Sequence, residues 1–391
     1  MKRILLTSTA LVAFAGAAAA ELTLGGDAEL GWNDSALIDG SEGLYYSFGL
    51  SLTAKNELDN GWKVGLNGDI EWNGSNSFNG NTITIDDMLL SLKSDKTSVY
   101  YGDTKTAAEA YYSTVTNMEF GDFIEDEHVD GSTDVFAGIT HTTGPADGIL
   151  RGETTLGNMN VAASVVDVED NITNTTTGLS SIEAAQLVVS STMGRLDFGA
   201  AYQAEIKPTT TANIVKSIMS FTVGTTVRGA DLKLAYSSQA DTGTSTGIQM
   251  SYPLSNGVTV KAFFVSNSPN TGTRDDNTGI EVAYAKGPMS FNALMHDGYD
   301  EDMQLNVTYA MDNGVNLYGG YRDEGKNTSN LQQGQITYVG ADYSLGGGAT
   351  LRGSYVDVTT TNAGGVATAA DEFGPGENLK EGLTVELGFK F

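Results

Sequence analysis

Apolar and polar residues alternate along most of the chain after residue 20, most clearly in its last eleven residues, 381–391. The apolar positions there are Leu383, Val385, Leu387, Phe389 and Phe391. Glu386 and Lys390 lie between them, and successive side chains of a strand point to opposite faces. About ten such residues, tilted by about 45°, span the hydrocarbon layer of a bilayer. The pattern predicts the closing strand of a transmembrane barrel, paired with the opening strand 22–32.

The same alternation recurs in hairpins, each centred on a turn rich in Gly, Pro, Asn or Asp. Nine hairpins with the first and last strands make twenty strands. Longer polar connections, among them 168–184, 240–246 and 358–381, alternate with the short turns, as in outer-membrane barrels. We therefore predict one all-β domain, residues 21–391, folded as an antiparallel up-and-down barrel. The predicted turns are Asn56–Gly61, Asp95–Lys96, Leu156–Asn158, Met193–Gly194, Gly224–Thr225, Leu254–Gly257, Lys286–Pro288, Asp312–Gly314 and Gly346–Gly348.

Aromatic residues near the strand ends support a membrane location. Trp62 and Trp72 share one face and lie ten residues apart. At about 3.3 Å per residue and about 40° tilt they are separated by roughly 25 Å, the height of the apolar band between the aromatic girdles of such barrels. A soluble sandwich, the alternative, would place more of its aromatic residues in mid-strand.

The first twenty residues are typical of an export signal. Lys2 and Arg3 precede a mostly apolar run, and small residues end it at Ala20. We predict cleavage between Ala20 and Glu21, with an uncleaved anchor as the alternative. No later run of about 18 apolar residues predicts a membrane-spanning helix.

Composition excludes several classes of protein. The chain has no cysteine, so it has neither disulfides nor thiolate sites. Its 49 acidic against 21 basic residues argue against binding to nucleic acid. A hydrophobic content of 40% argues against disorder, to which so acidic a chain is otherwise prone.

One connection, residues 104–131, is longer and more acidic than its neighbours. A connection of this length in a compact fold is usually functional or disordered. It has seven acids against the single base Lys105. It is either a solvated outer loop or a loop folded into the barrel, where its acids narrow the opening. The acids are Glu109, Glu119, Asp122, Glu125, Asp126, Glu127 and Asp130.

Five segments carry a resemblance to a known family: ELTLGGDAELGW (21–32), YYGD (100–103), ILRGETTLGNMNVAASVVD (149–167), YVGADYSLGGGATLRGSYVD (338–357) and ELGFKF (386–391). In their order, and with a terminal Phe391, they resemble Gram-negative general porins of the alphaproteobacterial, Rhodobacter-type group. The resemblance implies a trimer of open barrels whose third loop, here 104–131, forms the constriction. It also implies that Phe389 and Phe391 act as the assembly signal. Such porins commonly have sixteen strands, so sixteen and twenty both stay open.

The resemblance further implies that the loop acids face basic residues on the barrel wall. Strand parity puts seven bases on the polar face, each of which has the alternative of a simple solvated charge. They are Lys55, Lys63, Arg151, Lys233, Lys261, Arg322 and Arg352.

No catalytic motif is apparent. The three histidines do not form an HExxH pattern, and no GxSxG elbow occurs. Acidic clusters at 125–130, 275–276 and 297–302 have oxygen ligands suited to calcium but lack EF-hand spacing. We expect no cofactor, with calcium as the alternative to solvated charge.

Together these features predict an outer-membrane channel for passive diffusion of small hydrophilic solutes and ions. Barrels of sixteen or more strands leave an aqueous lumen, and acidic linings favour cations. We expect outer-membrane lipid as surroundings, a homotrimer and weak cation selectivity. The alternatives are a substrate-selective porin and a secreted or surface acidic β protein that binds calcium or ligand without transport.

Overall fold

The computed structural model describes residues 21–34, 43–75, 82–121, 123, 148–168, 181–205, 216–272, 275–298, 302–323, 334–360, 379 and 381–391. Over these ranges the chain forms twenty strands and one five-residue helix. None of the described helical structure is long and apolar enough to cross a membrane. The elements are β1 (Glu21–Asn33), β2 (Gly43–Glu57), β3 (Lys63–Ser75), β4 (Thr82–Lys93), β5 (Thr97–Gly102), α1 (Ala107–Tyr111), β6 (Gly148–Leu156), β7 (Met159–Val168), β8 (Ser181–Met193), β9 (Leu196–Gln203), β10 (Ile218–Val227), β11 (Ala230–Gln239), β12 (Gly243–Pro253), β13 (Val258–Pro269), β14 (Asn277–Lys286), β15 (Met289–Asp297), β16 (Asp302–Ala310), β17 (Val315–Asp323), β18 (Gly334–Gly346), β19 (Ala349–Thr360) and β20 (Gly382–Lys390).

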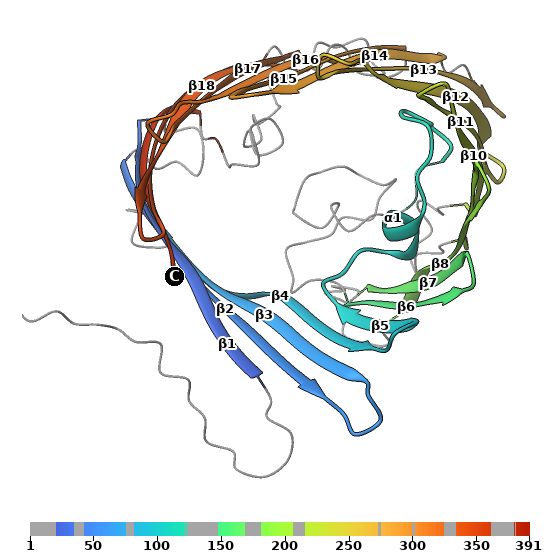
Figure 1. Ribbon diagram of the computed structural model, residues 1–391, viewed down its shortest axis with the longest axis horizontal. Helices are drawn as coiled ribbons and strands as arrows, with labels where there is room; N and C mark the ends of the chain where they lie inside the picture. The colour runs from blue at the N-terminus through green and yellow to red at the C-terminus, as the bar shows by residue number, and fades with distance from the viewer. Residues whose placement is uncertain are drawn as a thin grey trace, which may run out of the picture.

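Every strand pairs antiparallel with its neighbours in the chain, and β20 pairs with β1, so the sheet closes into a barrel (Figure 1). At the closure Trp32 lies opposite Val385 and Asp27 opposite Lys390. Two further backbone hydrogen bonds join Gly26 and Phe391. The predicted count of twenty strands and the predicted pairing of the two ends of the chain are both confirmed, and the sixteen-strand alternative is wrong.

Two predicted connections are wrong in position or length. The turn expected at Gly224–Thr225 lies at Arg228–Gly229, whose φ angles of 52° and 84° suit the left-handed positions of a two-residue hairpin. Gly224 is inside β10 and pairs with Asp197 and Lys233. The long connection expected at 240–246 is a three-residue link, since β12 begins at Gly243. Glycine without positive φ is compatible with a strand interior, which misled the prediction.

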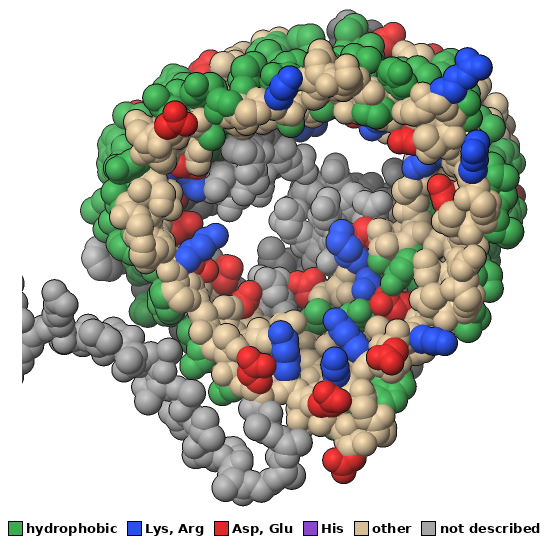
Figure 2. Space-filling model, viewed as in Figure 1, with side chains coloured by type: hydrophobic (Ala, Val, Ile, Leu, Met, Phe, Trp, Pro, Cys, Tyr) green, Lys and Arg blue, Asp and Glu red, His purple; other side chains and the backbone are tan. Residues whose placement is uncertain are grey.

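The two faces of the sheet differ in chemistry. Large apolar side chains on the outer face are exposed, among them Leu24 (61%), Leu234 (56%) and Val339 (60%). Figure 2 shows hydrophobic side chains around the outer rim and charged side chains facing an opening through the molecule. An apolar band around a polar lumen is the arrangement of a barrel embedded in lipid.

Buried apolar side chains lie on the lumen side, where segments fold against the wall. The constriction segment, described for residues 104–121 and 123, places Ala107, Ala108 and Phe123 against Ala162, Val188, Ala201 and Ile218 of the wall. Further along, Val115 and Met118 pack on Ala235, Phe263 and Val265. On the other side of the lumen Leu379 packs against Tyr318, Ile336, Tyr338 and Val356. The constriction segment is therefore a packed part of the barrel.

Candidate pore lining and constriction

The constriction segment begins with helix α1, which lies inside the barrel (Figure 1). Thr106 caps the helix, and its Oγ1 accepts a hydrogen bond from the Glu109 amide at 3.4 Å. Lys105 forms an ion pair with Glu109 one turn later. A threonine cap and an acid in the first turn satisfy amides and complement the helix dipole. Glu109, a predicted constriction acid, is therefore held at the start of α1.

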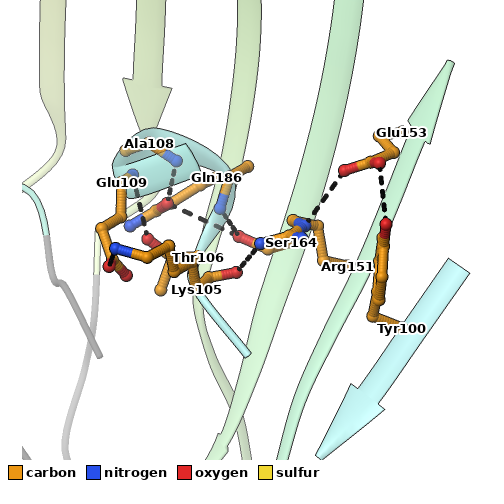
Figure 3. Close-up of polar contacts among 10 residues, drawn as sticks. Tyr100, Lys105, Thr106, Ala108, Glu109, Arg151, Glu153, Ser164 and Gln186 are labelled. Carbon is orange, nitrogen blue, oxygen red and sulfur yellow. Dashed lines mark hydrogen bonds and ion pairs between the residues drawn. The ribbon is translucent and has the colours of Figure 1, made fainter. Parts of the chain in front are cut away.

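The barrel wall supplies acceptors for the remaining amides of the first turn (Figure 3). The Ala107 amide donates to Ser164 Oγ at 2.8 Å, and the Ala108 amide donates to Gln186 Oε1 at 2.9 Å. Gln186 Nε2 in turn donates to Gln203 Oε1 at 2.9 Å. The first amides of a helix have no partner within the helix, so these wall side chains fix both the position and the direction of α1.

Arg151, predicted as a wall base, joins the loop to the wall. The buried guanidinium donates to the Lys105 carbonyl. Its Nε lies 3.3 Å from Glu153 Oε2, and its Cζ lies 4.5 Å from the centre of the Tyr100 ring. Tyr100 also donates to Glu153 at 3.1 Å (Figure 3). The charge of Arg151 is therefore balanced by Glu153, and the Arg151 guanidinium binds the backbone carbonyl of Lys105 in the constriction segment.

The second half of the constriction segment is attached to β11–β15 in the same way. Lys233 Nζ donates to Ser113 Oγ at 2.6 Å and to the Thr114 carbonyl at 3.3 Å. The remaining contacts come from neutral side chains of the wall. Gln249 Oε1 accepts from the Thr116 amide and hydroxyl, Ser245 Oγ accepts from the Phe120 amide, and Asn277 Nδ2 donates to the Asn117 carbonyl and to Glu119 Oε1.

Glycines on the wall make room for two apolar side chains of the segment. A Cβ atom at Gly243 would lie 2.5 Å from the Phe120 ring, and one at Gly247 would lie 2.9 Å from Val115. Contacts that short do not occur between real atoms, so the close packing of the segment requires glycine at both positions.

At the tip of the segment, Asn117 has a left-handed φ of 57° and contacts His296 of β15, with 3.3 Å between Asn117 Nδ2 and His296 Nδ1. His296 Nε2 lies 3.4 Å from Glu281 Oε1, which also pairs with Lys261 at 2.7 Å. Lys261, another predicted wall base, is therefore neutralised within the wall.

The wall across the lumen has its own ion pairs. Arg352 lies 3.1 Å from both Asp342 and Glu386, and Glu386 also accepts from Tyr45 at 2.8 Å. Arg322 lies 3.3 Å from Asp302. Two carboxylates meet one guanidinium around Arg352, so this cluster has a net negative charge.

Four further predicted positions lie away from these contacts. Lys55 and Lys63 are exposed beside the short turn after β2, where Lys55 lies opposite Glu21 and Lys63 opposite Lys93. Phe389 lies opposite Ala28. Phe391 stacks on Phe48 with 6.1 Å between ring centres. Six predicted residues lie outside the described part of the chain: Ala20, Asp122, Glu125, Asp126, Glu127 and Asp130.

Calcium was the alternative to simple solvated charge for the acidic clusters. Within the described residues, no group of three or more His, Asp or Glu side chains is placed to hold a metal ion. Asp276 instead accepts a hydrogen bond from the Asn267 amide at 2.9 Å, and the Asp275 carbonyl accepts from Asn267 Nδ2 at the same distance. Asp276, through its carboxylate, and Asp275, through its backbone carbonyl, thus fix the chain at the start of β14.

Two tyrosines of the constriction segment stay uncharged at ordinary pH. Burial, with the nearby Glu153 carboxylate, raises the pKa of Tyr111 to about 12. Burial likewise raises the pKa of Tyr112 to about 12. Neither phenol adds charge to the lumen at neutral pH.

Neutral wall residues that hold the segment were missed by sequence reasoning, which searched for charges. Ser164, Gln186 and Gln203 are among the most buried polar side chains described. One signal for them was present: on these strands the polar face has small residues such as Ala162 and Ala201 beside an amide or hydroxyl. Such a face leaves space for a second layer of chain inside the barrel.

A closed barrel with an apolar exterior, a charged lumen and an inward-folded segment defines a membrane channel. The family model for Gram-negative porins matches residues 7–363. The chain belongs to the Gram-negative porin family, and it is an outer-membrane β-barrel channel for passive diffusion.

Solved structures similar to this chain include two triple mutants of the Rhodopseudomonas blastica porin. One is 13% identical and the other 12%, and in each case the match covers 95% of this chain and all of the other, with a TM-score of 0.40. None of the curated proteins matches the chain.

Proposed function

We propose that this outer-membrane channel passes small hydrophilic solutes and ions with a weak preference for cations. The observation that carries the proposal is the pairing of the wall bases. Lys261, Arg322 and Arg352 each contact wall carboxylates. Arg151 and Lys233 are engaged with the constriction segment. Because these bases are paired or engaged, their positive charge is largely offset. The excess of acidic residues in the chain then sets the sign of the electric field in the lumen.

The preference is expected to be weak because the charges are exposed to lumen water and are screened at physiological salt. Reversal potentials in a KCl gradient across a planar bilayer test it. A potential of the sign that favours potassium is expected, and one that favours chloride would contradict the proposal. Opening of the channel itself is scored separately, as conductance in symmetric KCl.

Two further parts of the proposal concern export and assembly. The basic and then apolar composition of residues 1–20 supports cleavage before Glu21, which mass spectrometry of the purified protein tests. The resemblance to Rhodobacter-type porins supports a homotrimer. Chemical cross-linking in detergent tests it, and a product no larger than a monomer would contradict it.

A further inference from the structure

A cavity of about 480 Å³ lies between the constriction segment and the wall formed by β8–β12. Tyr111, Tyr112 and Ser113 form one side, and Gly224 lies on the wall side. Its wall residues lie within a few positions of the short turns after β8, β10 and β12. The volume lies in the range of ordinary small-molecule sites, about 300–1,000 Å³.

Two acidic side chains and one basic side chain line this cavity: Asp197, Asp231 and Lys233. Asp231 and Lys233 lie two residues apart on β11 and share a face, so their Cα atoms are about 7 Å apart. Asp197 is separated from Lys233 by Gly224, because Gly224 pairs with both residues. Two strand spacings put those Cα atoms about 9.6 Å apart.

Threonines orient both carboxylates. Thr192 donates to Asp197 Oδ1 at 2.7 Å, and Thr226 donates to Asp231 Oδ1 at 2.6 Å. Each carboxylate keeps its second oxygen as a further acceptor. Lys233 donates to Ser113 and Thr114, and an ammonium has three donors, so among the residues that the structure describes one donor remains for a ligand.

We propose that this cavity binds small zwitterionic solutes of the α-amino acid class on their way through the lumen. Bonds of about 1.5 Å put the ammonium and carboxylate of such a solute about 3 Å apart. A hydrogen bond of about 2.8 Å at each end extends the span between the lysine nitrogen and the aspartate oxygen to about 8–9 Å. Lys233 and the two aspartates share one face of the wall, with their Cα atoms about 7–10 Å apart, so one solute of this size can reach both kinds of charge. The ammonium faces the aspartates, and the carboxylate faces Lys233.

Solutes with one kind of charge fit the cavity less well. An anion meets two carboxylates beside Lys233, and a cation meets the ammonium of Lys233. Both aspartates are exposed, so each contact is weak, and we expect a dissociation constant on the order of 1 mM. Weak binding suits a diffusion channel, because the solute has to leave again.

The proposal rests on the channel function only in requiring a water-filled lumen. The test is therefore made at equilibrium, by saturation-transfer NMR of the detergent-solubilised barrel. L-Alanine is compared with lactate, which lacks the ammonium, and with alaninamide, which lacks the carboxylate. Saturable binding of alanine is expected, with lactate and alaninamide weaker by about fivefold or more. Equal binding of all three, or no binding of alanine, would overturn the proposal, whatever the reversal potentials show.

A filled cavity provides the matched variant. A Cβ at Gly224 meets nothing nearer than 3.6 Å, so Gly224→Leu places its side chain in the cavity. Gly388 of β20 faces the lumen elsewhere and has similar space, with its nearest neighbour at 4.0 Å, so Gly388→Leu is the control. We expect G224L to lose alanine binding and G388L to keep it. Alanine binding by G224L equal to that of the parent would refute the site.

If G224L does not form a heat-modifiable barrel, the variant Asp197→Asn tests the proposed site instead. It is expected to weaken alanine and alaninamide by about fivefold and to leave lactate unchanged or tighter. An unchanged affinity for alanine would overturn the proposal.

Discussion

Arg352 shows how single residues hold the lumen wall together. Its guanidinium joins Asp342 on β18 to Glu386 on β20. Both carboxylates are largely buried, with 17% and 8% of their side chains exposed. Mostly buried acids that lose their base are left with uncompensated charge, which costs more than the pair contributes.

Arg352→Gln is therefore expected to destabilise the barrel by about 1–3 kcal/mol, less than a fully buried pair would lose because lumen water screens the charges. The temperature at which the folded band disappears in detergent gels measures this. The same variant removes one positive charge and should strengthen cation preference. Glu386→Gln, the control, should shift selectivity the other way. A shift of the same sign in both variants would contradict this account of Arg352.

At the scale of elements, neutral hydrogen bonds hold helix α1 of the constriction segment against the wall. The donors are the first amides of α1, and Ser164 and Gln186 of the wall accept them. Apolar packing of Ala107, Ala108 and Phe123 adds to these contacts. Because a buried amide without an acceptor is costly, the segment should resist displacement.

The double variant S164A/Q186A removes both acceptors and should weaken docking of α1 by about 2–4 kcal/mol. The segment then occupies several positions, so single-channel current should become noisier while the barrel still assembles. Ser290→Ala is the matched control, since Ser290 pairs with Thr308 between β15 and β16, whereas α1 packs mainly on β7 and β8. Quiet current in the double variant would contradict this role of Ser164 and Gln186, because apolar packing and the hydrogen bonds of Arg151 and Lys233 would then be enough to hold the segment.

The last strand closes the barrel, and its final residue takes part in the closure. Phe391 exchanges two backbone hydrogen bonds with Gly26, and its ring stacks on Phe48. Deletion of Phe391 should therefore reduce the yield of assembled barrel more than the conductance of the barrels that form. Phe48→Leu loses the ring contact but keeps the terminal residue. Normal assembly without Phe391, scored as heat-modifiable protein in the outer membrane, would contradict its role.

At the scale of the whole molecule, the sequence predicted the features that depend on the local alternation of apolar and polar residues. Alternation along each strand identified twenty strands, and Leu383 to Phe391 identified the closing edge. The turn at Arg228–Gly229 was misplaced because Gly224 is equally compatible with a turn and with an extended strand. Contacts of the constriction segment were not predictable, because Thr116 meets Gln249 only after the seven strands β6–β12 have formed. Residues such as Thr116 and Gln249 meet because of the register of strand pairing around the barrel, and no local sequence pattern specifies that register.

Selectivity is also a property of the whole lumen, and it tests the pairing of wall charges. The double variant E281Q/D302N removes the charge of Glu281, which pairs with Lys261, and of Asp302, which pairs with Arg322, while every base remains. The lumen gains two net positive charges, so the reversal potential in a KCl gradient should move toward chloride. Lys55→Gln, an exposed change beside a short turn, should move it little. If the double variant and Lys55→Gln shift the potential equally, the paired bases do not govern the field, and the acid excess acts through other residues.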